Sequence, residues 1–298
     1  MPSVNKVESR AVDKIRNLID ELEYVTERFN TNDKGQSWDG YIDLYHGNPD
    51  VKANLDGIIY VQIKGRTVHA KRLEVKCKFD LDKVDLENFN KVDGTIFFLV
   101  KMKDNGDFKV YYSALLPKNI HDLLKEQPNT KNEIKIQLKE VKDAFHLEKI
   151  CRNFFEDQRK QKKLDFELFN NSNLLMNNCK SARFSDWNRG KYNPLEILGE
   201  EKFVYLYNEE EKVIGVEFVT INELVKNENK NIIGKDGKIF YSEIKRVIDV
   251  DGNIRVIFGN GIFQLSTNPK EFKYFVKGSL DQRLIGIEFV ENMMDAAS

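Results

Sequence analysis

Three polar residues near the ends of two predicted strands could together hold a divalent metal ion and activate a water molecule. Gln62 and Lys64 end an apolar run, and both side chains point to one face because the side-chain period of a strand is two. Asp39 lies in the preceding predicted strand, residues 38–45. A carboxylate, an amide oxygen and the backbone carbonyl of Ile63 are oxygen ligands that Mg²⁺ accepts, and an ammonium group can steer a water molecule at a phosphodiester.

Two further acidic residues complete this set or compete within it. Glu8 lies in a predicted helix, residues 5–23, in which apolar residues recur at steps of three and four. Taken alone, Glu8 is better explained as a first-turn acid that favours the helix dipole. Asp43 shares a strand face with Asp39, so it is the alternative metal ligand.

The order of the predicted elements indicates an α/β (α+β) domain. Residues 95–100 are apolar on both faces, which is typical of a central strand. The predicted elements are a helix at 5–23, strands near 24–30, 38–45, 57–64, 72–79, 94–102 and 107–113, and helices at 115–125 and 143–163.

A change of character after residue 165 predicts a second domain. Short strands and tight turns follow residue 199, and the dipeptides Asp251-Gly252 and Asn260-Gly261 favour two-residue hairpins. The tail after Ser279 could be helical. The predicted organisation is a domain at 1–165, an Asn-rich and basic-aromatic linker at 166–198, and a smaller, mainly antiparallel β domain at 199–298.

The overall charge gives no general attraction to nucleic acid. The formal net charge is −1 and the isoelectric point is about 6.5, so polyanion binding requires a local patch. In one segment, cations interleave with Phe184, Trp187 and Tyr192, which suits a nucleic-acid backbone and splayed bases. A solvated linker with a few docked aromatic side chains explains that segment equally well. The candidate nucleic-acid-binding residues are Lys180, Arg183, Arg189 and Lys191.

Composition argues against several other classes of protein. Three cysteines share no metal-ligand spacing and no signal peptide is evident, so we expect a reduced, cytoplasmic protein. The four histidines form no pair at ligand spacing, and the sequence lacks Gly-x-Ser-x-Gly, which argues against zinc and serine hydrolases. No apolar stretch is long enough to span a bilayer, so no membrane partner is expected.

Two motifs resemble the PD-(D/E)XK nuclease superfamily, and more closely a bacterial Mrr-like family that carries Trp-Asp-Gly and Val-Gln-x-Lys-Gly. Trp38-Asp39-Gly40 and Val61-Gln62-Ile63-Lys64-Gly65 match these motifs. The similarity extends to Lys277-Gly278-Ser279-Leu280, so it spans most of the chain. The first motif favours Asp39 over Asp43 as the metal ligand.

The resemblance implies a restriction-endonuclease-like domain that uses Mg²⁺, for which Mn²⁺ can substitute. In this superfamily an Asp and the Asp, Glu or Gln of the second motif help to bind the metal. The Lys assists the attacking water, and an early-helix Glu often completes the site. Carried over, the catalytic residues are Glu8, Asp39, Gln62 and Lys64, and the metal ligands are Asp39, Gln62 and the carbonyl of Ile63.

The expected substrate is DNA, in bacterial defence or restriction, although RNA presents the same phosphodiester. The β domain would then supply substrate recognition, control or homo-oligomer formation. A neutral Gln62 weakens the metal site on charge alone. The alternative is therefore a non-catalytic module of nuclease fold that binds nucleic acid or a protein partner.

Overall fold

A computed structural model places most of the chain, in two compact units. The first unit comprises Met1–Gly190 with Phe203–Glu217, and the second comprises Lys191–Lys202 with Phe218–Ser298. The residues that the structure describes are 4–30, 37–69, 73–74, 76–126, 132–162, 164–166, 179–187, 193–234, 237–275 and 279–297.

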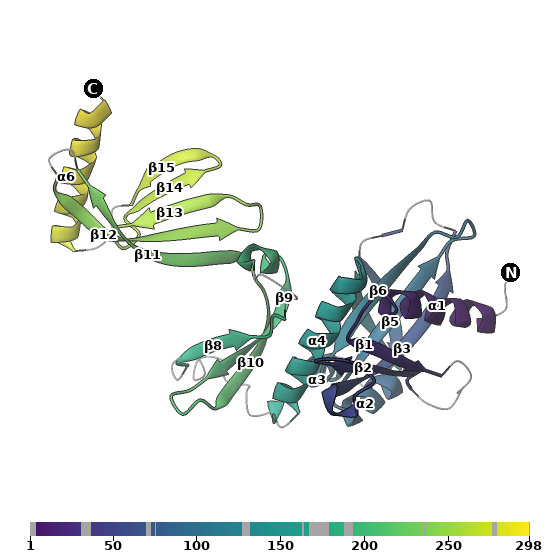
Figure 1. Ribbon diagram of the computed structural model, residues 1–298. Helices are drawn as coiled ribbons and strands as arrows, with labels where there is room; N and C mark the ends of the chain where they lie inside the picture. Colours follow the sequence, from purple (N-terminus) through teal and green to yellow (C-terminus); the bar gives the residue numbers. More distant parts are fainter. Residues whose placement is uncertain are drawn as a thin grey trace. The chain divides into compact units, whose positions relative to one another are not determined.

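The first unit is built on a seven-stranded mixed sheet (Figure 1). Its strand order is β1-β2-β3-β5-β6-β7-β4, and within it only β3 and β5 pair in parallel. Parallel neighbours need a crossover connection, which β4 and α2 provide here. The elements are α1 (Val4–Ile19), β1 (Val25–Phe29), β2 (Gly40–Tyr45), η1 (Lys52–Asn54), β3 (Leu55–Thr67), β4 (Lys76–Asp82), α2 (Lys83–Lys91), β5 (Thr95–Met102), β6 (Phe108–Leu115), α3 (Pro117–Glu126), β7 (Glu133–Glu140) and α4 (Ala144–Gln161).

Helices pack on both faces of this sheet. The side chains of β3 point alternately to the two faces, so each can be assigned to one of the two cores. Ile59, Val61 and Ile63 are buried in a core that includes residues of α1 and α4. A second core, on the opposite face, combines residues of α2 and α3 with β4–β7. Because neighbouring residues of a strand point to opposite faces, Gln62 and Lys64 lie on the face opposite α1 and α4.

A three-stranded sheet extends the first unit. Its order is β10-β9-β8, with β8 at Ser181–Phe184, β9 at Glu201–Tyr207 and β10 at Val213–Thr220. Phe203, Tyr205 and Val216 are buried in the same core as α1 and α4. The sequence placed a domain boundary at residue 199, whereas residues 203–217 belong to the first unit. The cause is local: β9 carries large apolar side chains that the first unit buries.

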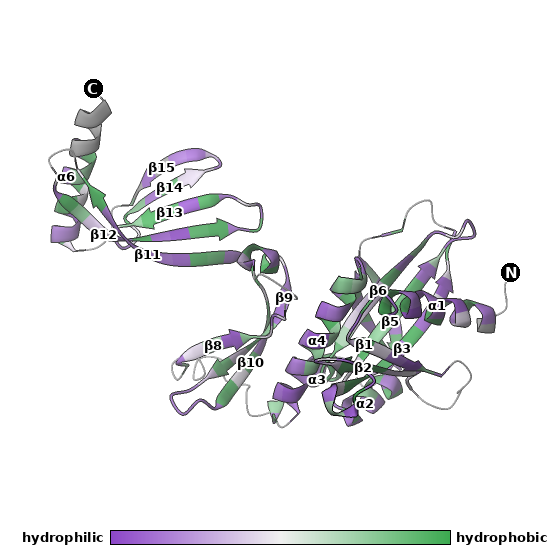
Figure 2. Cartoon of the chain, viewed as in Figure 1, coloured by the Kyte–Doolittle hydropathy of each residue, from purple (hydrophilic) through white to green (hydrophobic). Residues whose placement is uncertain are grey.

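The second unit contains a five-stranded antiparallel sheet, order β11-β12-β13-β14-β15. Hairpins are present at both predicted places, since β12 pairs with β13 and β13 with β14. Their connections are longer than the predicted two residues, because Ile248 pairs with Ile254 and Phe258 pairs with Phe263. Positive φ angles at Gly252, Asn260 and Gly261 explain these dipeptides. Figure 2 shows both hydrophobic and hydrophilic stretches on this sheet, with a long hydrophilic stretch on β11. The elements are η3 (Pro194–Ile197), β11 (Glu223–Ile233), β12 (Ile239–Asp249), β13 (Ile254–Phe258), β14 (Phe263–Thr267), β15 (Lys270–Tyr274) and the predicted terminal helix α6 (Leu280–Ala297).

The fold class predicted from the sequence is confirmed at the level of a mixed α/β unit accompanied by antiparallel sheets. Within the described part of the chain, no helix combines the length and the apolar character needed to cross a membrane.

Candidate functional site

Asp39 lies directly before β2 and is fixed to the edge of β3 by three hydrogen bonds. Its backbone N–H donates to the carbonyl of Val61 at 2.8 Å. Its carboxylate oxygen Oδ2 accepts from Gln62 Nε2 at 2.8 Å and from the backbone N–H of Ile63 at 2.7 Å. The next residue, Gly40, has a φ of 152°, and a Cβ there would lie 2.2 Å from a carbonyl oxygen of β1. Glycine after Asp39 is therefore required by the close approach of β1.

The charged residues predicted to join Asp39 act on it electrostatically. Burial raises the pKa of the Asp39 carboxyl above its ordinary value, and the nearby Glu8 carboxylate raises it further. The hydrogen bond from Ile63 and the ammonium group of Lys64 oppose these effects by lowering the pKa. Asp39 thus interacts with Glu8, Gln62, Ile63 and Lys64, the full set that sequence reasoning selected.

Gly65 explains how α1 brings Glu8 to this end of β3. A Cβ at Gly65 would lie 2.7 Å from the carbonyl oxygen of Val7 and 3.1 Å from Cβ of Ala11. Only a residue without a side chain lets the helix approach the strand so closely. Glu8 follows Val7 on α1 and lies close enough to Asp39 to raise the pKa of that carboxyl. Sequence reasoning had not assigned Gly65 a role, although a glycine beside a candidate Lys is a signal of close backbone approach.

The oxygen atoms near Asp39 are of the types that Mg²⁺ prefers as ligands. Alternate carbonyls of a strand point to the same edge, so the Ile63 carbonyl faces the edge where the Val61 carbonyl accepts from Asp39. Oδ1 of Asp39 has no hydrogen-bond partner among the described residues. Two protein oxygens with several waters make an arrangement that Mg²⁺ commonly uses. The described residues contain no group of three His, Cys, Asp or Glu side chains placed to hold a metal, so any metal here depends on neutral oxygens as well.

The Gln62 amide donates a hydrogen bond to Asp39 through its nitrogen, whereas the predicted metal-ligand role would use its oxygen. Its side chain is only 4% exposed, and its amide nitrogen is directed at Asp39. An amide donates through nitrogen and accepts through oxygen, so in this arrangement Gln62 orients the carboxylate. An ionised carboxylate at this position would have no hydrogen to donate to Asp39.

The alternative ligand, Asp43, is engaged elsewhere. Its Oδ1 accepts a hydrogen bond of 2.7 Å from Nη2 of Arg28, and its side chain is 6% exposed. A buried carboxylate that forms an ion pair with an arginine is stabilised without a metal. The partner could not be seen in the sequence because it depends on the β1–β2 register, in which Arg28 faces Tyr41 and Thr26 faces Asp43.

The predicted nucleic-acid-binding segment is largely neutralised where it is described. Lys180 pairs with Glu209 at 2.9 Å, and Arg183 pairs with Glu211 at 2.6 Å. The Arg183 guanidinium also lies 4.6 Å from the ring centre of Tyr207. Arg189 and Lys191 lie outside the described residues. These acidic partners on the β9–β10 hairpin reduce the positive potential that a polyanion would meet.

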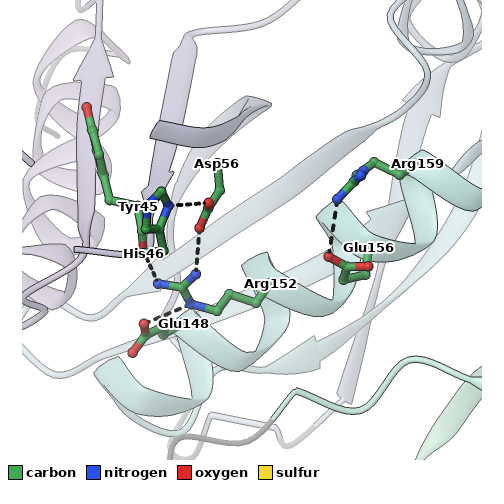
Figure 3. A network of polar contacts seen from close by, with 7 residues as sticks. All are labelled: Tyr45, His46, Asp56, Glu148, Arg152, Glu156 and Arg159. Carbon is green, nitrogen blue, oxygen red and sulfur yellow. Dashed lines mark hydrogen bonds and ion pairs between the residues drawn. The ribbon is translucent and has the colours of Figure 1, made fainter. Parts of the chain in front are cut away.

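A second polar cluster joins α4 to the far ends of β2 and β3 (Figure 3). Arg152 donates from Nη2 to the Tyr45 carbonyl at 2.8 Å and from Nε to Glu148 at 3.0 Å. Its Nη1 lies 3.6 Å from Asp56, whose other oxygen is 2.7 Å from His46 Nδ1. The Glu148 side chain is 1% exposed, so Arg152 compensates a buried charge. This cluster holds the sheet against α4.

Replacing Arg152 with Met is expected to lower the free energy of unfolding by about 3 kcal/mol, because it leaves the buried Glu148 carboxylate without its cation. The matched control is Arg159→Met on the same helix. Arg159 is 67% exposed and pairs with Glu156 at 3.8 Å, so its loss should cost under about 1 kcal/mol. Urea denaturation of both variants measures the difference. Equal stabilities would show that Arg152 contributes no more than a surface ion pair.

No protein-family model, no curated protein and no solved structure matches the chain.

Proposed function

We propose that the protein is a Mg²⁺-dependent nuclease that hydrolyses phosphodiester bonds of DNA in the bacterial cytoplasm, in defence or restriction. The observation that supports this most strongly is the fixed carboxylate of Asp39. Gln62 and the backbone N–H of Ile63, both on β3, hold this carboxylate by hydrogen bonds. Lys64 and Glu8 lie close enough to shift its pKa. The motif resemblance supplies the class of reaction.

Each residue has a separate task in this proposal. Asp39 Oδ1 and the Ile63 carbonyl would hold the metal ion, and Gln62 keeps the carboxylate turned towards it. A bound Mg²⁺ would supply Lewis-acid polarisation of the phosphate and a more acidic water molecule. Glu8 would accept a hydrogen bond from a water of the metal's shell.

Lys64 would orient the attacking water and stabilise the negative charge that develops on the phosphate. No ion-pair partner lies within 4.0 Å of its ammonium group in the described part of the chain. Its charge is therefore not cancelled by a direct contact and is available to a substrate. The second unit, which contributes no residue to this set, would serve substrate docking or assembly with a second copy.

The second candidate function is a non-catalytic module that binds nucleic acid or a protein. The Gln62–Asp39 hydrogen bond favours it, because this bond gives one oxygen of the carboxylate a partner when no metal is bound. The two functions predict different results with metal ions. A nuclease cleaves with Mg²⁺ or Mn²⁺, whereas a binding module binds with Ca²⁺ and cleaves with none of the three.

Exchanging Gln62 for Glu is expected to raise the affinity for Ca²⁺ by roughly 10-fold or more, since ligand charge sets the affinity of such sites. The metal-free variant should melt at a lower temperature, because two carboxylates would then face each other without the hydrogen bond from Gln62. Titration calorimetry and thermal melts with and without Ca²⁺ measure both effects. Gln137→Glu, an exposed change on β7, is the control and should alter neither. Unchanged Ca²⁺ affinity in Gln62→Glu would show that no bound metal lies within reach of the side chain at position 62.

The proposed function is tested by incubating pure protein with plasmid, single-stranded DNA or RNA in Mg²⁺, Mn²⁺, Ca²⁺ or EDTA. We expect cleavage of DNA with Mg²⁺ and Mn²⁺ and none with EDTA. Cleavage of RNA alone would change the substrate class. Binding without cleavage under every condition would favour the non-catalytic module.

A further inference from the structure

Part of the sheet face that carries Gln62 and Lys64 is open to solvent. On this face, α2 and α3 pack over β4–β7, through a core that includes Leu86, Phe89 and Ile120. The β1–β3 part of the same face lies outside that core. There Ile58, which pairs with Asp43 of β2, is 39% exposed. This open face borders the candidate site.

A row of side chains crosses the open face from strand to strand. Arg28 on β1 is in register with Tyr41 on β2, and Tyr41 is in register with Tyr60 on β3. The two tyrosine rings lie 4.9 Å apart, and the Arg28 guanidinium lies 5.5 Å from the ring of Tyr41. Both tyrosines are partly exposed. We call Arg28, Tyr41 and Tyr60 the aromatic row.

The aromatic row lies two residues along the strands from the candidate site. Tyr60 precedes Gln62 by two residues and Asp39 precedes Tyr41 by two, a separation of about 6.6 Å along a strand. Trp38, the residue before Asp39, packs beside the row, since its ring is 5.1 Å from that of Tyr60 and it also contacts the second core. A strand of nucleic acid with a phosphate at Asp39 would therefore place a neighbouring nucleotide over the row.

The chemistry of the row suits an unpaired nucleotide. Tyrosine rings provide stacking platforms for bases whatever their sequence, and arginine adds a cation. The Arg28 side chain is 58% exposed, and its contact with Asp43 uses one terminal nitrogen, so other donors of the fork can reach a phosphate. In a duplex, each base already stacks on its neighbours and cannot lie flat on a protein ring.

We infer that the aromatic row binds an unpaired nucleotide next to the scissile phosphate, so that the substrate is single-stranded DNA or an unpaired end. This inference deepens the proposed function and rests on it. The stretch 180–192 is not needed for this contact, which agrees with the pairing of Lys180 and Arg183 to acidic residues.

Binding is measured as fluorescence anisotropy of a labelled oligothymidylate and of a labelled duplex, both in Ca²⁺. We expect tighter binding of the single strand, and about 10-fold weaker binding of that strand by Tyr41→Leu and by Tyr60→Leu. Tyr60→Phe, which keeps the ring, should bind within about twofold of the unaltered protein. Phe108→Leu is the matched control, because Phe108 is 40% exposed on β6 and lies outside the row.

A second measurement needs no variant, so it stands even if the leucine variants do not fold. An oligonucleotide containing 5-iodouracil is irradiated with the unaltered protein in Ca²⁺, and the crosslinked residue is found by mass spectrometry. We expect Tyr41 or Tyr60. Crosslinks confined to other residues would overturn the inference. So would a folded Tyr60→Leu protein that binds the single strand as tightly as the unaltered protein does.

The two proposals fail in different ways. Mg²⁺-dependent cleavage of duplex DNA that Tyr60→Leu leaves unchanged would refute the aromatic row and leave the nuclease standing. Crosslinking at the row, with no cleavage of any substrate in Mg²⁺ or Mn²⁺, would refute the nuclease and leave a single-strand-binding face.

Discussion

Replacing Lys64 with Ala or Met should lower the rate of phosphodiester cleavage by at least about 100-fold, while Ca²⁺ binding and the melting temperature stay close to those of the unaltered protein. The reason is that the ammonium group acts on the attacking water and on charge that develops only in the transition state. Lys64 is partly exposed and forms no hydrogen bond with the described residues, so its removal should cost the fold little. Initial rates on a labelled oligonucleotide measure the effect.

Two comparisons separate chemistry from structure. Lys78→Ala removes an exposed lysine of β4 and should cleave at the normal rate. Lys64→Met keeps most of the apolar length of the side chain. If Lys64→Ala and Lys64→Met lose cleavage rate equally, the loss comes from the missing positive charge. Normal cleavage by a folded Lys64→Ala protein would remove Lys64 from the mechanism.

Ending the chain at residue 165, where the sequence places the domain boundary, should prevent the first unit from folding stably. This truncation removes Phe203, Tyr205 and Val216 from the core that contains α1 and α4. Each buried side chain of this size contributes about 1.5–3 kcal/mol, and the sum is comparable with the total stability of a domain, about 5–15 kcal/mol. It also removes the Tyr205 hydroxyl, which donates to the buried Asp157 at 3.0 Å.

A chain that ends at Thr220 is the comparison, because it keeps β8, β9 and β10. We expect it to melt cooperatively, and the chain ending at 165 to show no cooperative transition by circular dichroism. Equal melting temperatures would show that β9 contributes nothing to the first core.

The sequence predicted the elements whose apolar pattern is long or regular. Helix α4 and the central strand β5 were found because their patterns are clear, and the two hairpins because their turn residues need positive φ angles. Several elements were missed, among them α2, β7 and β8, the last of which lies in the segment predicted to be a linker. Helix α2 has nine residues of which only Leu86 and Phe89 are buried, so its period is hard to recognise. Strand β7 alternates cleanly but pairs with β4, which is remote in the sequence.

The candidate site was predictable where it depends on alternation along one strand. Gln62 and Lys64 share a face for that reason, and Asp39 follows from the pairing of β2 with β3. The direction of the Gln62 hydrogen bond was not predictable, because an amide can donate or accept. The ion pairs of Arg28, Lys180 and Arg183 depend on strand register and on the β9–β10 hairpin, which only the folded chain defines.

The central claim is that a divalent ion held beside Asp39 drives phosphodiester cleavage. It is tested most directly by the cleavage rate of a single-stranded DNA oligonucleotide as free Mg²⁺ is raised from an EDTA buffer. The unaltered protein and Asp39→Ala, purified in parallel, are compared. We predict a rate that rises and saturates for the unaltered protein and stays at background for Asp39→Ala. Equal rates in both proteins, or no cleavage by either at any Mg²⁺ concentration, would contradict the account.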